Sequence, residues 1–242
     1  MNQTSAASFG KMHSGTFPEI AMLLYPGLTL LDLLGPQTVL ASSCHVHLVW
    51  KNLEPIETDT GITIHPTTTF ADCPPQLDVL FVGGGPGKLG ILNDPEVIRF
   101  LAERGKRARF VTSVCTGSLL LGAAGLLRGY ESACHWACLD LLSLFGAKPV
   151  AKRVVVDRNR ISGGGVTAGI DFGLVLLEKI MGTEIAKTTQ LVMEYAPQPP
   201  FDCGSPDKAG PEILQHAREW LGPMEAVLLA ACQQAVPNMP AG

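Results

Sequence analysis

The chain has 242 residues, of which 46% are hydrophobic and 17% are charged, with a formal net charge of −4 and a pI near 5.8. This length and composition favour one large globular domain with a full core over two small domains. The chain is acidic and contains no run of five or six basic residues, so we expect no nucleic acid and no membrane partner.

Residues 1–17 are small and polar with a single lysine, and they lack the apolar segment of a secretory signal. We therefore expect a disordered N-terminal tail, followed by one domain over residues 18–242. No apolar stretch approaches the roughly 18 residues that a membrane-spanning helix requires. The seven cysteines are scattered and odd in number, which favours a reduced, cytoplasmic protein over a disulfide framework.

Apolar runs of strand length alternate with segments of helical periodicity along the chain. Several of the runs are almost continuously apolar, as strands covered on both faces are. The alternation predicts a doubly wound α/β fold, in which helices sandwich a mostly parallel sheet. Strands are predicted, in order, at residues 19–25, 45–51, 77–84, 108–114 and 153–164. Helices are predicted at residues 94–107, 116–124, 135–145 and 167–181.

Three further segments complete the expected organisation. Residues 55–68 are predicted to add an antiparallel hairpin, and residues 196–211 to form a proline-rich loop. The last amphipathic segment, residues 212–235, is predicted to be broken at Gly222 and Pro223. In a doubly wound sheet the ligand crevice lies beyond the carboxyl ends of the strands, so we expect chemistry where strand meets helix.

The segment GGGPGKLG at residues 83–90 is the first joint of this kind. It has the glycine spacing of a dinucleotide-binding loop, but Glu103, the nearest acidic residue at the required distance, falls within a predicted helix. A phosphate loop needs Ser or Thr after its lysine, and Lys88 is followed by Leu89. What remains is a run of backbone N–H groups, which either hold a developing negative charge or form a tight turn.

The second joint contains Cys115 within the sequence SVCTG, residues 113–117. It has the form of the strand–nucleophile–helix turn usually written G-x-S-x-G, with cysteine in the nucleophile position. At the amino end of a helix, free N–H groups favour the thiolate and lower the pKa of a thiol from about 8.5. The alternative is a buried core cysteine, which is what most cysteines are.

Asp32 is the only charged residue in the apolar stretch LYPGLTLLDLLGP, residues 24–36. A carboxylate in such surroundings is unfavourable unless it is paired, so Asp32 is either a helix cap or an acid with a raised pKa. The ends of the first and fourth strands can be neighbours in a doubly wound sheet. We therefore expect a protonated Asp32 to lie beside the thiolate of Cys115 as an acid–base pair.

Other candidate residues point to chemistry less directly. Cys134, His135 and Cys138 would bind a metal only with a fourth ligand from elsewhere, and their spacing matches no common zinc pattern, so a helix face packed in the core is favoured. His45 and His47 share one face of a predicted strand and are expected to be structural.

A third joint, SGGGVTAGID at residues 162–171, repeats the order of strand, glycines and helix. Its free amides, around Gly165 and Val166, either adjoin the cysteine site or only permit close packing.

Six segments together resemble the ThiJ/PfpI superfamily, and within it the isocyanide hydratase branch, over residues 19–207. The cysteine motif alone is typical of the whole superfamily. Asp32 and Thr116 narrow the resemblance to the hydratase branch, because many other members carry Glu at the acid position and some carry His after the cysteine. Cys134 departs from the pattern, in which Thr precedes the His-Trp pair. The six segments are LYPGLTLLDLLGP, FVGGGPG, VTSVCTGSLLLGAAGLLRG, HWACLDLL, RISGGGVTAGIDFGL and EYAPQPPFDCGSP.

The resemblance implies a flavodoxin-like domain of the class I glutamine amidotransferase type, a homodimer, and no metal or organic cofactor. It also implies that water is added to an isocyanide, R–N≡C, to give an N-substituted formamide. Cys115 would be the nucleophile that forms a thioimidate, Asp32 the general acid and base, and Thr116 a hydrogen-bonding neighbour. The residues expected to line the pocket are Gly84, Gly85, Gly165 and Val166.

Three other functions would use the same features. A glyoxalase or deglycase, as in other branches of the superfamily, would direct the same thiol at an aldehyde. A ligand-sensing domain related to AraC-type regulators would share much of the pattern, but such proteins need a further helix-turn-helix module. A redox sensor would oxidise a reactive thiol to sulfenic or sulfinic acid. Asp32 and Thr116 favour the hydratase over the glyoxalase.

Overall fold

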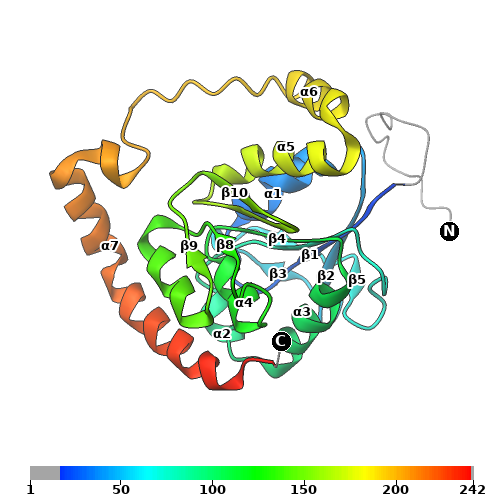
Figure 1. The fold of residues 1–242 in the computed structure, drawn as a ribbon, viewed down its shortest axis with the longest axis horizontal. Coiled ribbons are helices and arrows are strands. Elements are labelled where there is room, and N and C mark those ends of the chain that lie inside the picture. Colours follow the sequence, from blue (N-terminus) through cyan, green and yellow to red (C-terminus); the bar gives the residue numbers. More distant parts are fainter. Residues whose placement is uncertain (1–16, 241–242) are drawn as a thin grey trace.

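The computed structural model describes residues 17–240. Its centre is a seven-stranded sheet in the order β10-β11-β7-β6-β1-β2-β5, with helices on both faces (Figure 1). Residues 1–16, most of the tail for which we predict disorder, lie outside the described residues. The strands of the sheet are β1 Glu19–Leu23, β2 His45–Trp50, β5 Thr68–Thr69, β6 Val79–Val82, β7 Phe110–Val114, β10 Val154–Asp157 and β11 Arg160–Gly163.

Neighbouring strands of this sheet run parallel, except for the pair β10 and β11. That pair forms an antiparallel hairpin, in whose turn Arg158 has a φ of 54°. Every residue of β6 is buried, as expected of a central strand covered on both faces. The prediction of a doubly wound, mostly parallel α/β sheet is therefore confirmed.

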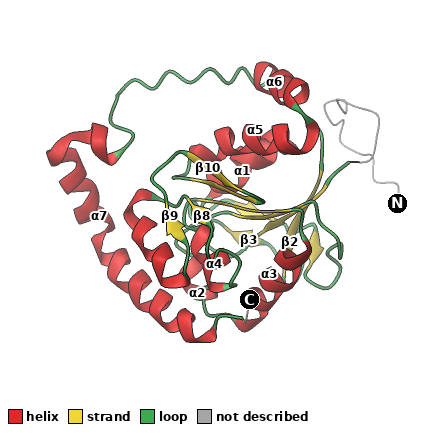
Figure 2. Cartoon of the chain, viewed as in Figure 1, coloured by secondary structure: helices red, strands yellow, loops and turns green. Residues whose placement is uncertain are grey.

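The helices form one layer on each side of the sheet, with α1 and α5 on one face and α3 and α4 on the other (Figure 2). Glycine allows α1 and α5 to approach closely, since a Cβ at Gly173 would lie only 3.0 Å from the Cβ of Val39. The helices are α1 Leu30–Leu40, α2 Lys88–Ile91, α3 Pro95–Arg107, α4 Gly117–Ala123, α5 Ala168–Met181, α6 Thr183–Val192 and α7 Pro206–Ala235.

The start of α3 follows directly from its sequence. The side chain of Asp94 accepts hydrogen bonds from the backbone N–H groups of Glu96 and Val97. Pro95 occupies the first position, where its missing N–H has no intrahelical partner to lose. The predicted helix over residues 94–107 is thus confirmed to within one residue.

Two predicted helices differ in detail from the structure. The segment predicted over residues 135–145 is a 3₁₀ helix, η1 Trp136–Phe145, which ends at a left-handed Gly146. The last helix, α7, begins before residue 212 and continues through Gly222 and Pro223, so the predicted break at that pair is wrong. The irregular residue is instead Gly210, with a φ of 75°. Gly210 also precedes a proline, and the residue before proline is disfavoured in the helical region.

Several short elements complete the fold. The predicted hairpin over residues 55–68 is present as β3 Ile56–Glu57 paired antiparallel with β4 Thr63–Ile64. A separate pair of short strands, β8 Glu131–Ser132 and β9 Lys148–Pro149, and the final 3₁₀ turn, η2 Val236–Asn238, were not expected. No helix within residues 17–240 is both long and apolar enough to cross a membrane.

Candidate active site

Cys115 lies at the sharp turn between β7 and α4. Its φ of 58° places it in the left-handed region, which a residue with a side chain adopts only when its surroundings impose it. The N–H of Cys115 donates to the carbonyl oxygens of Gly163 at 3.1 Å and Gly164 at 2.7 Å, which fixes this conformation. A small residue is needed two positions on, because a Cβ at Gly117 would lie 2.1 Å from the carbonyl oxygen of Val82.

Asp32 lies in the first turn of α1 and is completely buried. The N-cap position belongs to Thr29, whose side chain makes no capping hydrogen bond, so the alternative of Asp32 as a helix cap is wrong. The backbone N–H of Gly84 donates to Asp32 Oδ2 at 2.7 Å. The loop after β6 therefore holds the carboxyl group in place.

The Asp32 carboxyl changes its charge near neutral pH. Burial raises its pKa from 3.8 to about 7, and the negative charge of Asp59 adds to this. The hydrogen bond from the Gly84 N–H, the neighbouring Cys115 thiol and the charge of Lys88 lower the pKa and only partly offset the burial. Asp32 lies next to the turn that holds Cys115, since a Cβ at Gly84 would lie 2.9 Å from Asp32 Oδ2 and 2.6 Å from the backbone N of Thr116. Asp32 Oδ1 has no hydrogen-bond partner among residues 17–240.

The thiol of Cys115 differs from the thiolate that its position in the sequence predicts. Burial raises its pKa well above the usual value, and a negative charge on Asp32 raises it further. The N–H of Thr116 and the charge of Lys88 act in the opposite direction but are outweighed. The reason is desolvation, because only 6% of Cys115 is exposed. The raised pKa of Cys115 favours its neutral thiol over the thiolate, while the raised pKa of Asp32, about 7, lies near neutral pH.

The two residues meet across β6 and not at adjacent strands. The expectation that β1 and β7 are neighbours is wrong, since β6 lies between them. The glycine loop after β6 makes the connection: the Gly84 N–H donates to Asp32, and the Gly85 N–H donates to Thr116 Oγ1 at 3.2 Å. A Cβ at Gly84 would lie 2.6 Å from Thr116 Oγ1 and 2.9 Å from Asp32 Oδ2, so only glycine fits there. Both amides thus have acceptors within the protein and position the pair.

A cavity of about 440 Å³ opens above this arrangement. Four of the seven predicted site residues line it, namely Cys115, Thr116, Gly85 and Val166. Asp32 and Gly84, which are hydrogen-bonded to each other, do not line the cavity. Gly165 lines a neighbouring cavity of about 420 Å³, which shares His135 and Val166 with the first.

Comparison with known protein families identifies the family of this chain. The sequence profile of the DJ-1/PfpI family matches residues 18–179. The chain belongs to the DJ-1/PfpI family. The predicted resemblance to ThiJ/PfpI proteins is therefore confirmed.

Two family members are similar over nearly the whole chain. Isonitrile hydratase from Pseudomonas putida is 51% identical over 207 residues, which cover 85% of this chain and 90% of that protein. The crystal structure of a ThiJ/PfpI family protein from Pseudomonas syringae has a TM-score of 0.88 and 45% identity, and the match covers 90% of this chain and 91% of that one.

A regulator shares only part of the chain. An HTH-type transcriptional regulator from Pseudomonas aeruginosa is 34% identical over 137 residues, which cover 56% of this chain. The matched region spans only 37% of the length of that regulator. The similarity therefore concerns a shared domain and not the whole regulator.

Sequence analysis missed several residues that line the cavity. Lys88 is almost fully buried, and its Nζ donates to the carbonyl oxygen of Gly85 at 3.2 Å. The position of Lys88 in a glycine loop at a strand end is the one sequence signal that marks it. Helix α7, which begins 91 residues after Cys115, contributes a further set of lining residues that no motif marks. The residues from α7 are Trp220, Leu221, Met224, Glu225 and Leu228.

Of the remaining cysteine and histidine candidates, His135 and Cys138 line the cavity at Cys115. Cys134 is buried, which raises its pKa to about 12. No group of three metal-binding side chains occurs in the part of the chain that the structure describes. His45 and His47 both contact the carboxylate of Glu19, which lies on the neighbouring strand β1.

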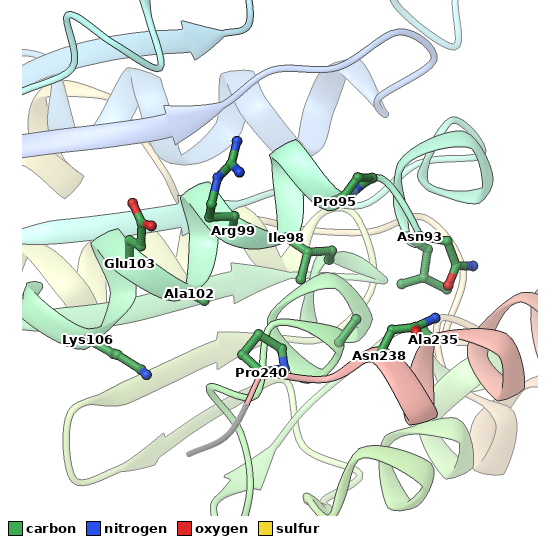
Figure 3. Close-up of a pocket in the computed structure, with 12 residues that line it drawn as sticks. Asn93, Pro95, Ile98, Arg99, Ala102, Glu103, Lys106, Ala235, Asn238 and Pro240 are labelled. Carbon is green, nitrogen blue, oxygen red and sulfur yellow. The ribbon is translucent and has the colours of Figure 1, made fainter.

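A larger cavity, of about 560 Å³, lies between α3 and the C-terminal segment (Figure 3). Ile98 and Lys106 line it from α3, and Asn238 and Pro240 from the chain end. None of the predicted site residues lines it, and none of its lining residues is a cysteine. Four of the predicted residues line the smaller cavity at Cys115 instead.

Proposed function

We propose that this protein is an isocyanide hydratase, which adds water to R–N≡C and releases an N-substituted formamide. The observation that carries the proposal is the buried pair of Asp32 and Cys115, in which burial raises the pKa of the carboxyl group to about 7 and the thiol lines a cavity. The similarity to an isonitrile hydratase over most of both chains supports the same reaction.

The first step joins the thiol to the isocyanide. The terminal carbon of an isocyanide accepts both a nucleophile and a proton. As Sγ of Cys115 forms a bond to that carbon, the thiol proton passes to the Asp32 carboxylate, and Asp32 then delivers it to the same carbon. The product is an enzyme-bound thioimidate, R–N=CH–S–Cys, and Asp32 is again a carboxylate.

The second step consumes water. Asp32 accepts a proton from a water molecule as the water oxygen adds to the thioimidate carbon, and Asp32 then donates this proton to the nitrogen, which gives R–NH–CH(OH)–S–Cys. As the C–S bond breaks, Asp32 accepts the hydroxyl proton and returns it to the sulfur, which releases the formamide and restores both the thiol and the carboxylate. A carboxyl group with a pKa of about 7 suits both roles, because it is an effective acid and an effective base at the same pH.

Thr116 has a supporting part in this scheme. Its hydroxyl oxygen accepts a hydrogen bond from the Gly85 N–H, so its own proton is directed away from that amide and is available to the cavity. We propose that this proton is donated to Asp32 or to the incoming substrate. Every proton in the scheme is carried by Asp32, Cys115 or water, so the scheme requires neither a metal nor an organic cofactor.

One assay tests this proposal. Purified protein is incubated with an aryl isocyanide and, separately, with methylglyoxal, and formamide formation or methylglyoxal loss is measured. We expect formamide from the native protein, none from Cys115→Ser, and a rate at least about 100-fold lower from Asp32→Asn. Cys203→Ser, which changes an exposed thiol, is the matched control and should retain activity. Methylglyoxal loss without formamide would assign the site to glyoxalase chemistry instead.

We also propose that the protein is a homodimer in the cytoplasm. Large apolar side chains are exposed at the end of α6 and in the loop that follows, where Leu191 is 80% and Phe201 is 75% exposed. A second copy of the chain that covers this surface would remove the apolar side chains from water. All seven cysteines are free thiols, as is usual in a reducing compartment.

A further inference from the structure

Lys88 is a buried cation that the proposed reaction does not yet use. It opens α2, and only 3% of it is exposed. Of its three N–H donors, one is used, by the carbonyl oxygen of Gly85. Within residues 17–240, no carboxylate lies within ion-pair distance of Nζ. A buried charge without a partner is unfavourable. The position of Lys88 beside the cavity therefore indicates that it stabilises a negative charge there.

The Asp32–Cys115 pair supplies such a charge. Once the pair has lost its first proton, it carries one negative charge, whether the remaining proton lies on sulfur or on oxygen. Lys88 lines the same cavity as Cys115, and its charge lowers the pKa of both members of the pair. A cation at this place favours the charged form of the pair without choosing where the remaining proton lies.

The other titratable groups around the pair do not replace Lys88. Burial raises the pKa of Tyr25, Cys134 and Cys138, and it lowers that of His135, so all four are neutral near pH 7. The remaining two are the carboxylates of Asp59, which raises the pKa of Asp32, and of Glu225 on α7. Among the described residues that line the cavity, Lys88 is therefore the one cation.

We propose that Lys88 is a positioning residue, a fixed cation that stabilises the negative charge of the Asp32–Cys115 pair. It acts through its electric field and not by contact with the substrate. The inference rests on the proposed function only in treating this pair as the reactive one.

The test measures the reactivity of Cys115 toward iodoacetamide from pH 6 to 10, with the modified peptide quantified by mass spectrometry. Lys88→Met keeps the length of the side chain and removes the charge, while Lys88→Arg keeps the charge. We expect the Met variant to react about tenfold more slowly at pH 7 and to approach the native rate at high pH, which is a shift of the profile by about one pH unit. The Arg variant should follow the native profile.

The matched control is Lys208→Met, which removes an exposed lysine paired with Asp202 and should not move the profile. A native profile in folded Lys88→Met would overturn the inference, as would a rate lowered equally at every pH, because that result indicates a merely structural role. If Lys88→Met does not fold, Lys88→Gln replaces it with the same two outcomes. The alkylation needs no isocyanide, so an absence of formamide would refute the proposed function and leave this result unaffected.

Discussion

The Asp32 carboxyl is costly to ionise in the folded protein. Its pKa is raised from 3.8 to about 7, so the folded state holds this proton over a pH range in which the unfolded chain has released it. The stabilising effect of the proton is therefore fully present below pH 3.8 and is lost as the pH rises to about 7. At about 1.36 kcal/mol per pH unit, the interval corresponds to about 4 kcal/mol.

The loss of stability with rising pH leads to a prediction about Asp32→Asn. The variant carries no titratable group at this site, so it should gain stability relative to the native protein as the pH rises from 4 to 8, by up to about 4 kcal/mol. The free energy of unfolding, measured in urea at several pH values for both proteins, checks this. A difference that does not change with pH would contradict the buried, high-pKa state of Asp32.

Gly84 gives a second prediction at the scale of single residues. A methyl group at this position would lie 2.6 Å from the Thr116 hydroxyl and 2.9 Å from the Asp32 carboxylate, so Gly84→Ala should displace both groups. A displacement of about 1 Å at a reacting group lowers the rate on the order of 100-fold, and formamide formation should fall by about this factor. Gly90→Ala is the control, because nothing lies within 4 Å of its added methyl group. Equal rates in the two variants would show that the close fit at Gly84 does not matter.

At the scale of elements, α7 forms one wall of the cavity and is anchored by few residues. Only Leu228, Cys232 and Ala235 of this helix are buried, and Leu228 also lines the cavity. Leu228→Ala should therefore lower the free energy of unfolding by about 2–5 kcal/mol and loosen this wall. Val227→Ala, which truncates an exposed neighbour, should change it by less than about 0.5 kcal/mol. Denaturant unfolding of both variants measures the contrast, and similar losses would contradict it.

Elements whose determinants are local were predictable from the sequence. The Asp94 cap defines the start of α3, and continuous apolar runs predict β1, β6 and β7. The end of a helix at a Gly-Pro pair was less predictable, because α7 contains two such pairs and only tertiary packing decides that Gly210 is the irregular one.

The candidate site was predictable in its residues but not in its arrangement. Cys115 and Asp32 carry local signals, a turn motif and an isolated charge. Their meeting across the glycine loop of β6 depends on strand order, which periodicity does not specify. The pKa of the thiol was expected to fall and instead rises, because burial is a property of the folded chain and outweighs the effect of a helix terminus.

At the scale of the whole molecule, the exposed apolar surface at the end of α6 predicts self-association. Phe201→Asp combined with Leu191→Asp should convert the proposed dimer into a monomer, because each change would bury a charge in the interface. Sedimentation velocity measures the mass in solution. Leu53→Asp, which changes an apolar residue that is exposed elsewhere, is the control and should leave the dimer intact. A native protein that is already monomeric would refute the proposal.

Trp220 stands at the rim of the cavity and is 84% exposed, whereas Trp50 is buried in the core. An indole in water emits at longer wavelength than one in apolar surroundings, so the chain contains an exposed fluorophore at the edge of the cavity that Cys115 lines. Occupation of the cavity by an aryl compound should quench this emission or shift it to the blue, and Trp220→Phe should abolish the response. Ligand entry can then be followed optically, in real time and without any label.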